Sequence, residues 1–208
     1  MARIPRCNLP DGLSHVTSRG NRRQAMFVIE RDAGAYLDLL DYVAPRISWV
    51  CLTYCLMPNH VHLLVDAAQE QLSAAMRYVN GVYAQRFNRE HGYRGHLLQG
   101  RFKAKPIVDE GHLAEAVRYI VMNPVRAGLC ERPELWPWSS YRAHLGLTSP
   151  RRFLDVRRVL RLFDRDDGKA REELRRYVEL ALPAGVARTE WGQSRGQSPF
   201  ESALPSQP

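Results

Sequence analysis

Several features are absent from this sequence, and their absence limits what the protein can be. No apolar run approaches the roughly 20 residues that a membrane-spanning helix needs. The first residues lack the apolar core of a signal peptide. The four cysteines form no C-x-x-C pair and have no disulfide or zinc-knuckle spacing; they are Cys7, Cys51, Cys55 and Cys130. We therefore expect a protein of the reducing cytoplasm with no membrane partner.

Acidic residues are too few to balance the basic ones. The chain of 208 residues carries a formal net charge of +8, and its sequence pI is about 9.6. Such a charge favours a polyanionic partner, above all a nucleic acid, although a basic soluble protein without such a partner has the same composition. The length and the 45% hydrophobic content allow one well-cored domain with appendages.

The hydrophobic periodicity predicts an alternation of strands and helices. Strands are expected at residues 14–19, 47–56, 60–65 and 97–108, and helices at residues 31–43, 72–87 and 110–122. The order strand, helix, strand, strand, helix, strand is that of the ferredoxin-like split βαβ fold, an α+β fold with an antiparallel sheet. We expect the helices to pack on one face of this sheet and the other face to stay free.

Two histidines begin the third predicted strand. His60 and His62 are two residues apart, so their side chains point to the same face, while Val61, Leu63 and Val65 point to the other. Paired imidazoles on an apolar strand can form half of a metal site. A structural role for both histidines is the alternative, because an H-x-H pair alone is a weak signal.

The predicted helix at residues 110–122 carries two further polar side chains. Tyr119 and Asn123 are four residues apart and share a face, with His112 two turns before Tyr119. If this face meets His60 and His62, two imidazoles and an amide oxygen surround a cation, with a phenol one turn away. Because these ligands are neutral, Mg²⁺ or Mn²⁺ would need an anionic substrate to complete the site. Spacing alone does not select Tyr119 among the phenols, which include Tyr36, Tyr54, Tyr78, Tyr83 and Tyr141.

Cations recur in two further segments. Arg101, Lys103 and Lys105 alternate with apolar or small residues in the predicted strand at residues 97–108, which would place three cations on one face. This arrangement predicts a track for nucleic acid, although charges on an edge strand can simply prevent aggregation. The loop at residues 19–23 carries Arg19, Asn21 and Arg22, which are candidates for phosphate contacts or for a solvated turn.

Several separated motifs resemble a known family. Residues 58–62, Pro-Asn-His-Val-His, resemble the metal-binding motif of the HUH single-strand nucleases. Residues 119–129, from Tyr119 to Leu129, resemble the nucleophile helix of the REP-associated tyrosine transposases, which are relatives of the single-tyrosine transposases of bacterial insertion sequences. Residues 15–22, 99–103 and 136–141 are also similar to this family. The resemblance covers residues 13–145.

The resemblance implies a metal-dependent endonuclease and strand transferase. His60 and His62 would be metal ligands for Mg²⁺ or Mn²⁺, and Tyr119 would become linked to the 5′ phosphate of cleaved single-stranded DNA. Asn123 falls where relatives place a third metal ligand, although some of them have glutamine there. The expected partner is single-stranded or hairpin DNA of the repetitive extragenic palindromes (REP), with no small-molecule cofactor.

Alternatives remain open at this point. A binding module of the same fold would hold nucleic acid without cutting it, and a hydrolytic metal phosphodiesterase would release a free 5′ phosphate. The sequence also leaves open whether the chain is a monomer or a homodimer.

The chain divides into four predicted segments. A basic lead-in covers residues 1–12, and the transposase-like catalytic domain covers residues 13–145. An arginine-rich helical extension follows at residues 146–182, with helices expected at 153–163 and 171–182. Gly, Ser, Gln and Pro dominate residues 183–208, which we expect to be disordered.

Overall fold

The protein is a four-stranded antiparallel sheet with helices on both faces, seen in a computed structural model that describes residues 11–182 and 200. The strands lie in the order β2-β3-β1-β4, and every neighbouring pair is antiparallel. This order confirms the predicted ferredoxin-like fold. The strands are β1 (Gly12–Arg19), β2 (Trp49–Met57), β3 (His60–Ala67) and β4 (Lys103–Pro106). The helices are α1 (Glu30–Val43), α2 (Gln69–His91), α3 (Glu110–Val121), α4 (Asn123–Arg126), α5 (Tyr141–His144), α6 (Val156–Leu160) and α7 (Asp167–Glu179).

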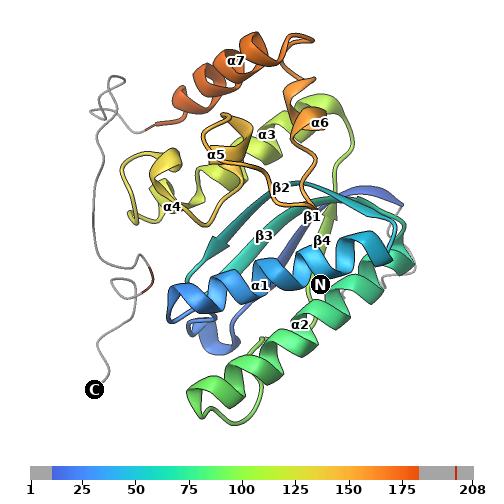
Figure 1. Cartoon of the computed structure of the whole chain (residues 1–208), viewed down its shortest axis with the longest axis vertical. Coiled ribbons are helices and arrows are strands. Elements are labelled where there is room, and N and C mark those ends of the chain that lie inside the picture. The colour runs from blue at the N-terminus through green and yellow to red at the C-terminus, as the bar shows by residue number, and fades with distance from the viewer. Residues whose placement is uncertain (1–10, 183–199, 201–208) are drawn as a thin grey trace, which may run out of the picture.

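The second face of the sheet is covered over β2 and β3, so the expectation that it stays free was wrong there; along β1 and β4 the described residues leave it open, and Lys103 and Lys105 are exposed on it. In Figure 1, α1 and α2 lie on one side of the sheet and α3 to α7 on the other. Helix α3 contacts β2 and β3 through its apolar stripe, in which Val117 and Ile120 are fully buried. The central strand β3 requires this cover, because its adjacent residues Leu64 and Val65 point to opposite faces and are both fully buried.

Local sequence explains where these elements begin and end. Asp109 accepts a hydrogen bond from the amide of His112 at 2.7 Å and so caps α3, whose start at residue 110 was predicted. The helical hydrogen bonding of α3 is interrupted at Pro124, because proline has no N–H to donate to the carbonyl of Ile120, and the short helix α4 begins at Asn123. Pro58 and Asn59 form the two-residue turn between β2 and β3.

Strand β4 is shorter than predicted. The sequence pattern indicated a strand over residues 97–108, but the regular ladder covers only Lys103–Pro106 and pairs with β1 at the edge of the sheet. Before it the chain bends at Gly100, whose φ of +141° is a conformation that side chains rarely adopt. Arg101 therefore precedes the strand, and only Lys103 and Lys105 alternate along it.

The helices after residue 150 also differ from their predicted bounds. Helix α6 spans only Val156–Leu160 within the predicted 153–163. Helix α7 begins at Asp167, four residues before the predicted start at 171, because the carboxylate of Asp166 accepts a hydrogen bond from the amide of Lys169 at 2.9 Å and caps the helix. Together with α5, these helices form the C-terminal layer in the upper part of Figure 1.

The aromatic segment at residues 136–141 packs over the core. Trp136 is 1% exposed and donates its indole N–H to the carbonyl of Leu56 at 2.9 Å. Its ring also contacts Phe200, the one described residue of the predicted disordered tail. The rest of that prediction, like the lead-in up to residue 10, lies outside the described residues. Within the described ranges, no helix is long and apolar enough to span a membrane.

Candidate active site

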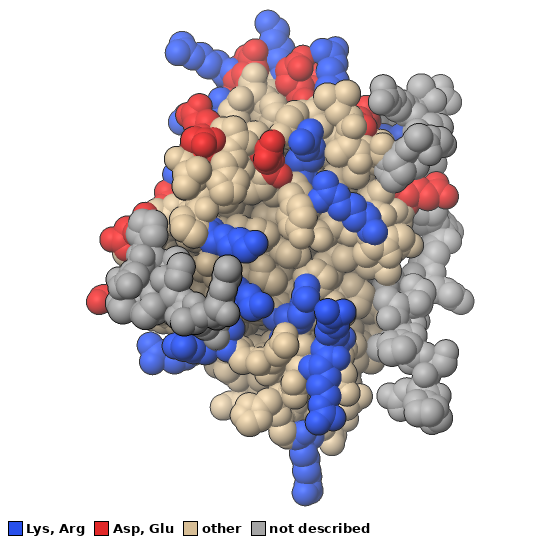
Figure 2. Space-filling model, turned by 180° about the vertical axis from the view of Figure 1, so that it is seen from behind, with Lys and Arg blue, Asp and Glu red and all other residues tan. Residues whose placement is uncertain are grey.

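A cleft of about 770 Å³ lies between the sheet and α3, near the β1–β4 edge. The sheet contributes side chains from alternate positions, because residues two apart in a strand share a face. Figure 2 shows the molecule from behind, with lysine and arginine side chains around a hollow on that face. The cleft is lined by His15, Thr17, Arg19, His62, Gln99, Gly100, Arg101, Lys103, Lys105, His112, Glu115, Ala116 and Tyr119.

The paired histidines of β3 lie on the α3 side of the sheet with their rings in contact. The ring centroids of His60 and His62 are 4.8 Å apart, with the rings nearly perpendicular. Burial, together with positive charge on nearby groups, lowers the pKa of His60 to about 4 and that of His62 to about 2. Both rings are therefore neutral near pH 7 and keep the lone pair that a metal ion requires.

The ring nitrogens of His62 differ in their surroundings. Nδ1 lies 2.8 Å from Nε2 of His15. Nε2 is buried and has no hydrogen-bond partner among the described residues. An unpaired buried nitrogen that can offer a lone pair fits a metal ligand. No group of three or more His, Cys, Asp or Glu side chains in the described part of the chain is placed to hold an ion, so a further ligand must come from another residue type or from substrate.

Tyr119 is the phenol that reaches this cleft. Its ring is 44% exposed and lies edge-on to His62 and to His15, with centroids 5.8 Å apart in each pair. The competing phenols do not reach the cleft. Tyr78 of α2 stacks on Tyr42 of α1 and does not line the cleft. The other four are buried: Tyr36, Tyr54, Tyr83 and Tyr141. The structure thus distinguishes Tyr119 where spacing could not.

Asn123 lies close to Tyr119 but is not among the residues that line the cleft. Its amide nitrogen donates to the carbonyl of Tyr119 at 2.8 Å and is 3.4 Å from that of Ile120. The side chain is thus bonded back onto the last turn of α3. A role as metal ligand stays a prediction that requires this side chain to turn toward the histidines.

The predicted nucleic-acid-binding residues fall into two groups. Arg19, Arg101, Lys103 and Lys105 all line the cleft, although only the two lysines belong to β4. In the second group, Asn21 and Arg22 lie in the 3₁₀ turn η2 (Asn21–Arg23) and are not among the lining residues. The amide of Asn21 donates to the carbonyl of Leu97 at 2.7 Å, which ties this turn to the segment before β4.

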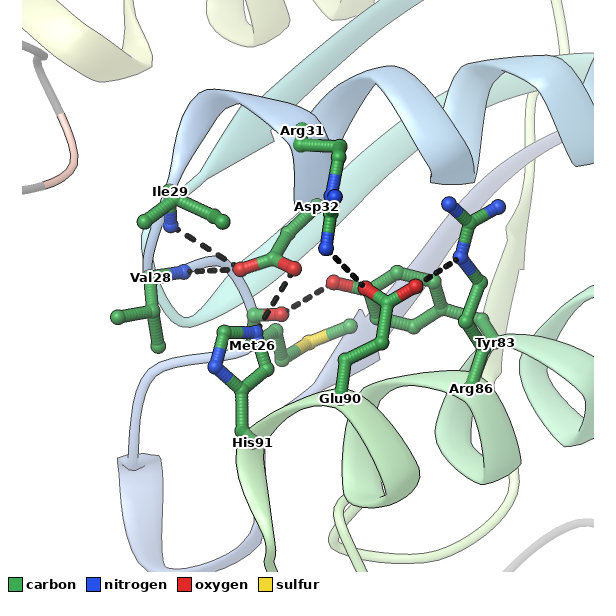
Figure 3. A network of polar contacts seen from close by, with 9 residues as sticks. All are labelled: Met26, Val28, Ile29, Arg31, Asp32, Tyr83, Arg86, Glu90 and His91. Atoms are coloured by element: carbon green, nitrogen blue, oxygen red, sulfur yellow. Dashed lines mark hydrogen bonds and ion pairs between the residues drawn. The ribbon is translucent and has the colours of Figure 1, made fainter.

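On the side of the sheet covered by α1 and α2, a polar network holds the loop at residues 26–29, which contacts the Pro58–Asn59 turn before His60 (Figure 3). The buried carboxylate of Asp32 accepts the amides of Val28 and Ile29 at 2.8 and 3.0 Å and lies 2.9 Å from Nε2 of His91. Tyr83 donates its hydroxyl to the carbonyl of Met26. The same loop donates the amides of residues 26 and 27 to the carbonyl of residue 58, so helices α1 and α2 hold the turn that precedes His60.

Several residues of the site were missed from the sequence. His15, Thr17, Gln99 and Glu115 line the cleft, and Glu115 is the only carboxylate among the described lining residues. Strand alternation placed His15 with Arg19 on one face, but its contact with His62 depends on the pairing of β1 with β3. Glu115 could have been found from its position four residues before Tyr119 on the same helix face.

Comparison with known proteins agrees with this arrangement. The family model of IS200-like transposases matches residues 11–123. A Haemophilus influenzae protein described as a REP-associated tyrosine transposase is 30% identical over 98 aligned residues, and the match covers 42% of this chain and 56% of that protein. The chain thus matches little more than half the length of this relative. A solved REP-associated tyrosine transposase bound to a REP hairpin shares the fold, with a TM-score of 0.58, 20% identity, and coverage of 75% of this chain and 93% of that one. The resemblance found in the sequence motifs is confirmed, and the chain belongs to the family of IS200-like transposases.

Proposed function

We propose that this protein is a metal-dependent single-stranded DNA endonuclease and strand transferase that acts on REP-type hairpin DNA. The observation that carries the proposal is the position of Tyr119, whose exposed phenol lies against the ring of His62 in a cleft lined by cations. A relative described as a REP-associated tyrosine transposase and a solved structure of this fold bound to a REP hairpin support the choice of substrate.

Tyr119 would be the nucleophile. Its phenolic oxygen gives up its proton, attacks the scissile phosphorus and forms a P–O bond, while the bond from phosphorus to the 3′ oxygen breaks. The 3′ oxygen leaves and takes up a proton, and the 5′ phosphate stays linked to Tyr119 as a phosphotyrosine ester. Because this ester keeps the energy of the phosphodiester, a 3′ hydroxyl can reverse the reaction and join strands. An exposed phenol at the cleft suits this role, since an incoming phosphate can reach it.

His60 and His62 would hold the divalent cation, Mg²⁺ or Mn²⁺, through their Nε2 atoms. The buried and unpaired Nε2 of His62 supports this assignment. Asn123 is the proposed third ligand after its side chain turns, and phosphate oxygens of the substrate would supply the negative charge that these neutral ligands lack. When bound, the ion would act as a Lewis acid on the phosphodiester and orient the departing oxygen.

The cations of the cleft would bind the DNA backbone. Arg19, Arg101, Lys103 and Lys105 line the same cleft as Tyr119, so a strand bound along them brings a phosphate to the phenol. Asn21 and Arg22 are proposed to extend this contact outside the cleft. Such contacts position the strand, and they carry no sequence information.

The test is incubation of labelled hairpin DNA with the protein and Mn²⁺, followed by a denaturing gel. The wild type should give a cleaved strand and a protein–DNA adduct. Tyr119→Phe should abolish both and leave DNA binding nearly unchanged, because the ring remains. Tyr93→Phe is the matched control, since Tyr93 is 52% exposed but does not line the cleft, and it should behave as the wild type.

Other results would identify the rival functions. Cleavage that persists in Tyr119→Phe and leaves a free 5′ phosphate would indicate a hydrolytic phosphodiesterase. DNA binding without any cleavage by the wild type, with Mg²⁺ or Mn²⁺ present, would indicate a binding module. Either result would refute the tyrosine mechanism.

A further inference from the structure

His62 is placed so that one neighbour can decide which of its ring nitrogens carries the proton. A neutral imidazole has one N–H, on Nδ1 or on Nε2. If the proton is on Nε2, the ring has a buried N–H without a partner in the described structure, and such an unpaired donor costs about 1–3 kcal/mol. If the proton is on Nδ1, it can be donated to His15 Nε2 at 2.8 Å. The second arrangement satisfies the donor and leaves the lone pair on Nε2.

We propose that His15 is a positioning residue for the cation site, which accepts the Nδ1–H of His62 and so keeps the Nε2 lone pair of His62 available to a divalent cation. This inference rests on the proposed function, because the cation is part of that proposal. His15 itself does not bind the ion. It fixes the orientation and the tautomer of a residue that does.

The other histidine of the pair shows the same arrangement. Nδ1 of His60 lies 2.6 Å from Oδ1 of Asn59, a carbonyl oxygen that can only accept. The amide nitrogen of Asn59 donates to the carbonyl of Arg23 at 3.0 Å, which holds that oxygen toward His60. Both imidazoles are therefore tied at Nδ1, one by a residue of the turn and one by a residue of β1.

Thr17 is the competing partner and is less suitable. It stands directly opposite His62 in the β1–β3 ladder, whereas His15 stands opposite Leu64, two residues along the strand. The Thr17 hydroxyl is nevertheless 3.4 Å from Nδ1 of His62, beyond the usual range of a hydrogen bond. The longer side chain of His15 reaches diagonally across the ladder to 2.8 Å, with ring centroids 5.0 Å apart.

The first measurement needs no metal. Long-range ¹H–¹⁵N NMR of the metal-free wild type reports which nitrogen of each histidine ring carries the proton, and His62 should carry it on Nδ1. In His15→Phe, which keeps a ring but removes the acceptor, the His62 proton should move partly or fully to Nε2. A wild-type His62 with its proton on Nε2 would overturn the inference. Circular dichroism would establish that each variant is folded.

The second measurement is the affinity for Mn²⁺, determined from the electron paramagnetic resonance signal of the free ion. His15→Phe should bind Mn²⁺ about 10–100-fold more weakly than the wild type. His15→Gln, whose amide oxygen can accept the same hydrogen bond, should recover part of the loss. Thr17→Val is the matched control on the same strand and should stay close to the wild type. Unchanged affinity in His15→Phe, or an equal loss in Thr17→Val, would refute the role of His15.

A third variant separates this inference from the proposed function. If His62→Ala binds Mn²⁺ as tightly as the wild type, the cation binds elsewhere and the proposed metal site fails. In that case the position of the His62 ring proton in the metal-free wild type still shows whether His15 fixes the tautomer of His62.

Discussion

The cationic lining of the cleft makes a quantitative prediction about salt. In a variant in which Arg101, Lys103 and Lys105 are all changed to Gln, three side chains that line the cleft lose their charge. Each phosphate contact to a single strand contributes about 0.7 to the slope of log affinity against log salt, so the slope should decrease by about 2. Between 50 and 200 mM salt, the wild type should therefore lose about 20-fold more affinity than the variant.

The assay is fluorescence anisotropy of a labelled single strand over that salt range. The matched control changes Arg77, Arg89 and Lys169 to Gln, which removes the same charge from exposed positions on α2 and α7 outside the cleft. This control should keep the wild-type slope. Equal slopes in the wild type and the cleft variant would refute the DNA track and leave the lysines of β4 as protection of an edge strand. A reduced slope in the control would show that net charge, and not the cleft, governs affinity.

Two further predictions concern stability. Burial lowers the pKa of His144 to about 4 from an ordinary value of 6.5, so below about pH 6.5 the unfolded chain binds a proton that the folded chain excludes. The free energy of unfolding should therefore be lower at pH 5.5 than at pH 7.5, by on the order of 1 kcal/mol from this residue. In urea unfolding, the stability of His144→Asn should depend less on pH than that of the wild type. The same pH dependence in both proteins would refute the assignment. In urea unfolding, Asp32→Ala should lower the free energy of unfolding by about 3 kcal/mol, because it leaves two backbone amides and His91 without their buried acceptor (Figure 3). The control is Glu90→Gln, whose ion-pair partners are partly exposed, and it should lower the free energy of unfolding by less than about 1 kcal/mol. Equal losses in the two variants would contradict this distinction.

Much of the fold could be predicted because the information is local. Alternation placed His60 and His62 on one face of a strand, and the Asp109 cap fixed where α3 begins. The packing of α3 on the second face of the sheet was missed, because the apolar stripe of a helix does not show which surface the helix packs against. The continuous apolar run Leu63, Leu64 and Val65 was the available signal, since a strand with one free face should alternate with polar residues.

The site was only partly predictable, for a different reason. Tyr119 and His62 are 57 positions apart, and the motif resemblance joined them where spacing could not. The contact between His15 and His62 depends on the exact register of β1 against β3, because a shift of one residue would turn His15 to the other face. The back-bonded amide of Asn123 follows from the break between α3 and α4, which residue spacing does not describe.

The phenol and the imidazoles of the cleft all belong to a single polypeptide. The ring of Tyr119 contacts those of His62 and His15 within the same chain, so these three side chains come together without a residue from a second subunit. Mixing Tyr119→Phe with His62→Ala should therefore restore no cleavage, because each chain keeps its own defect. The rate of the wild type should rise in simple proportion to protein concentration, whether or not the chains associate.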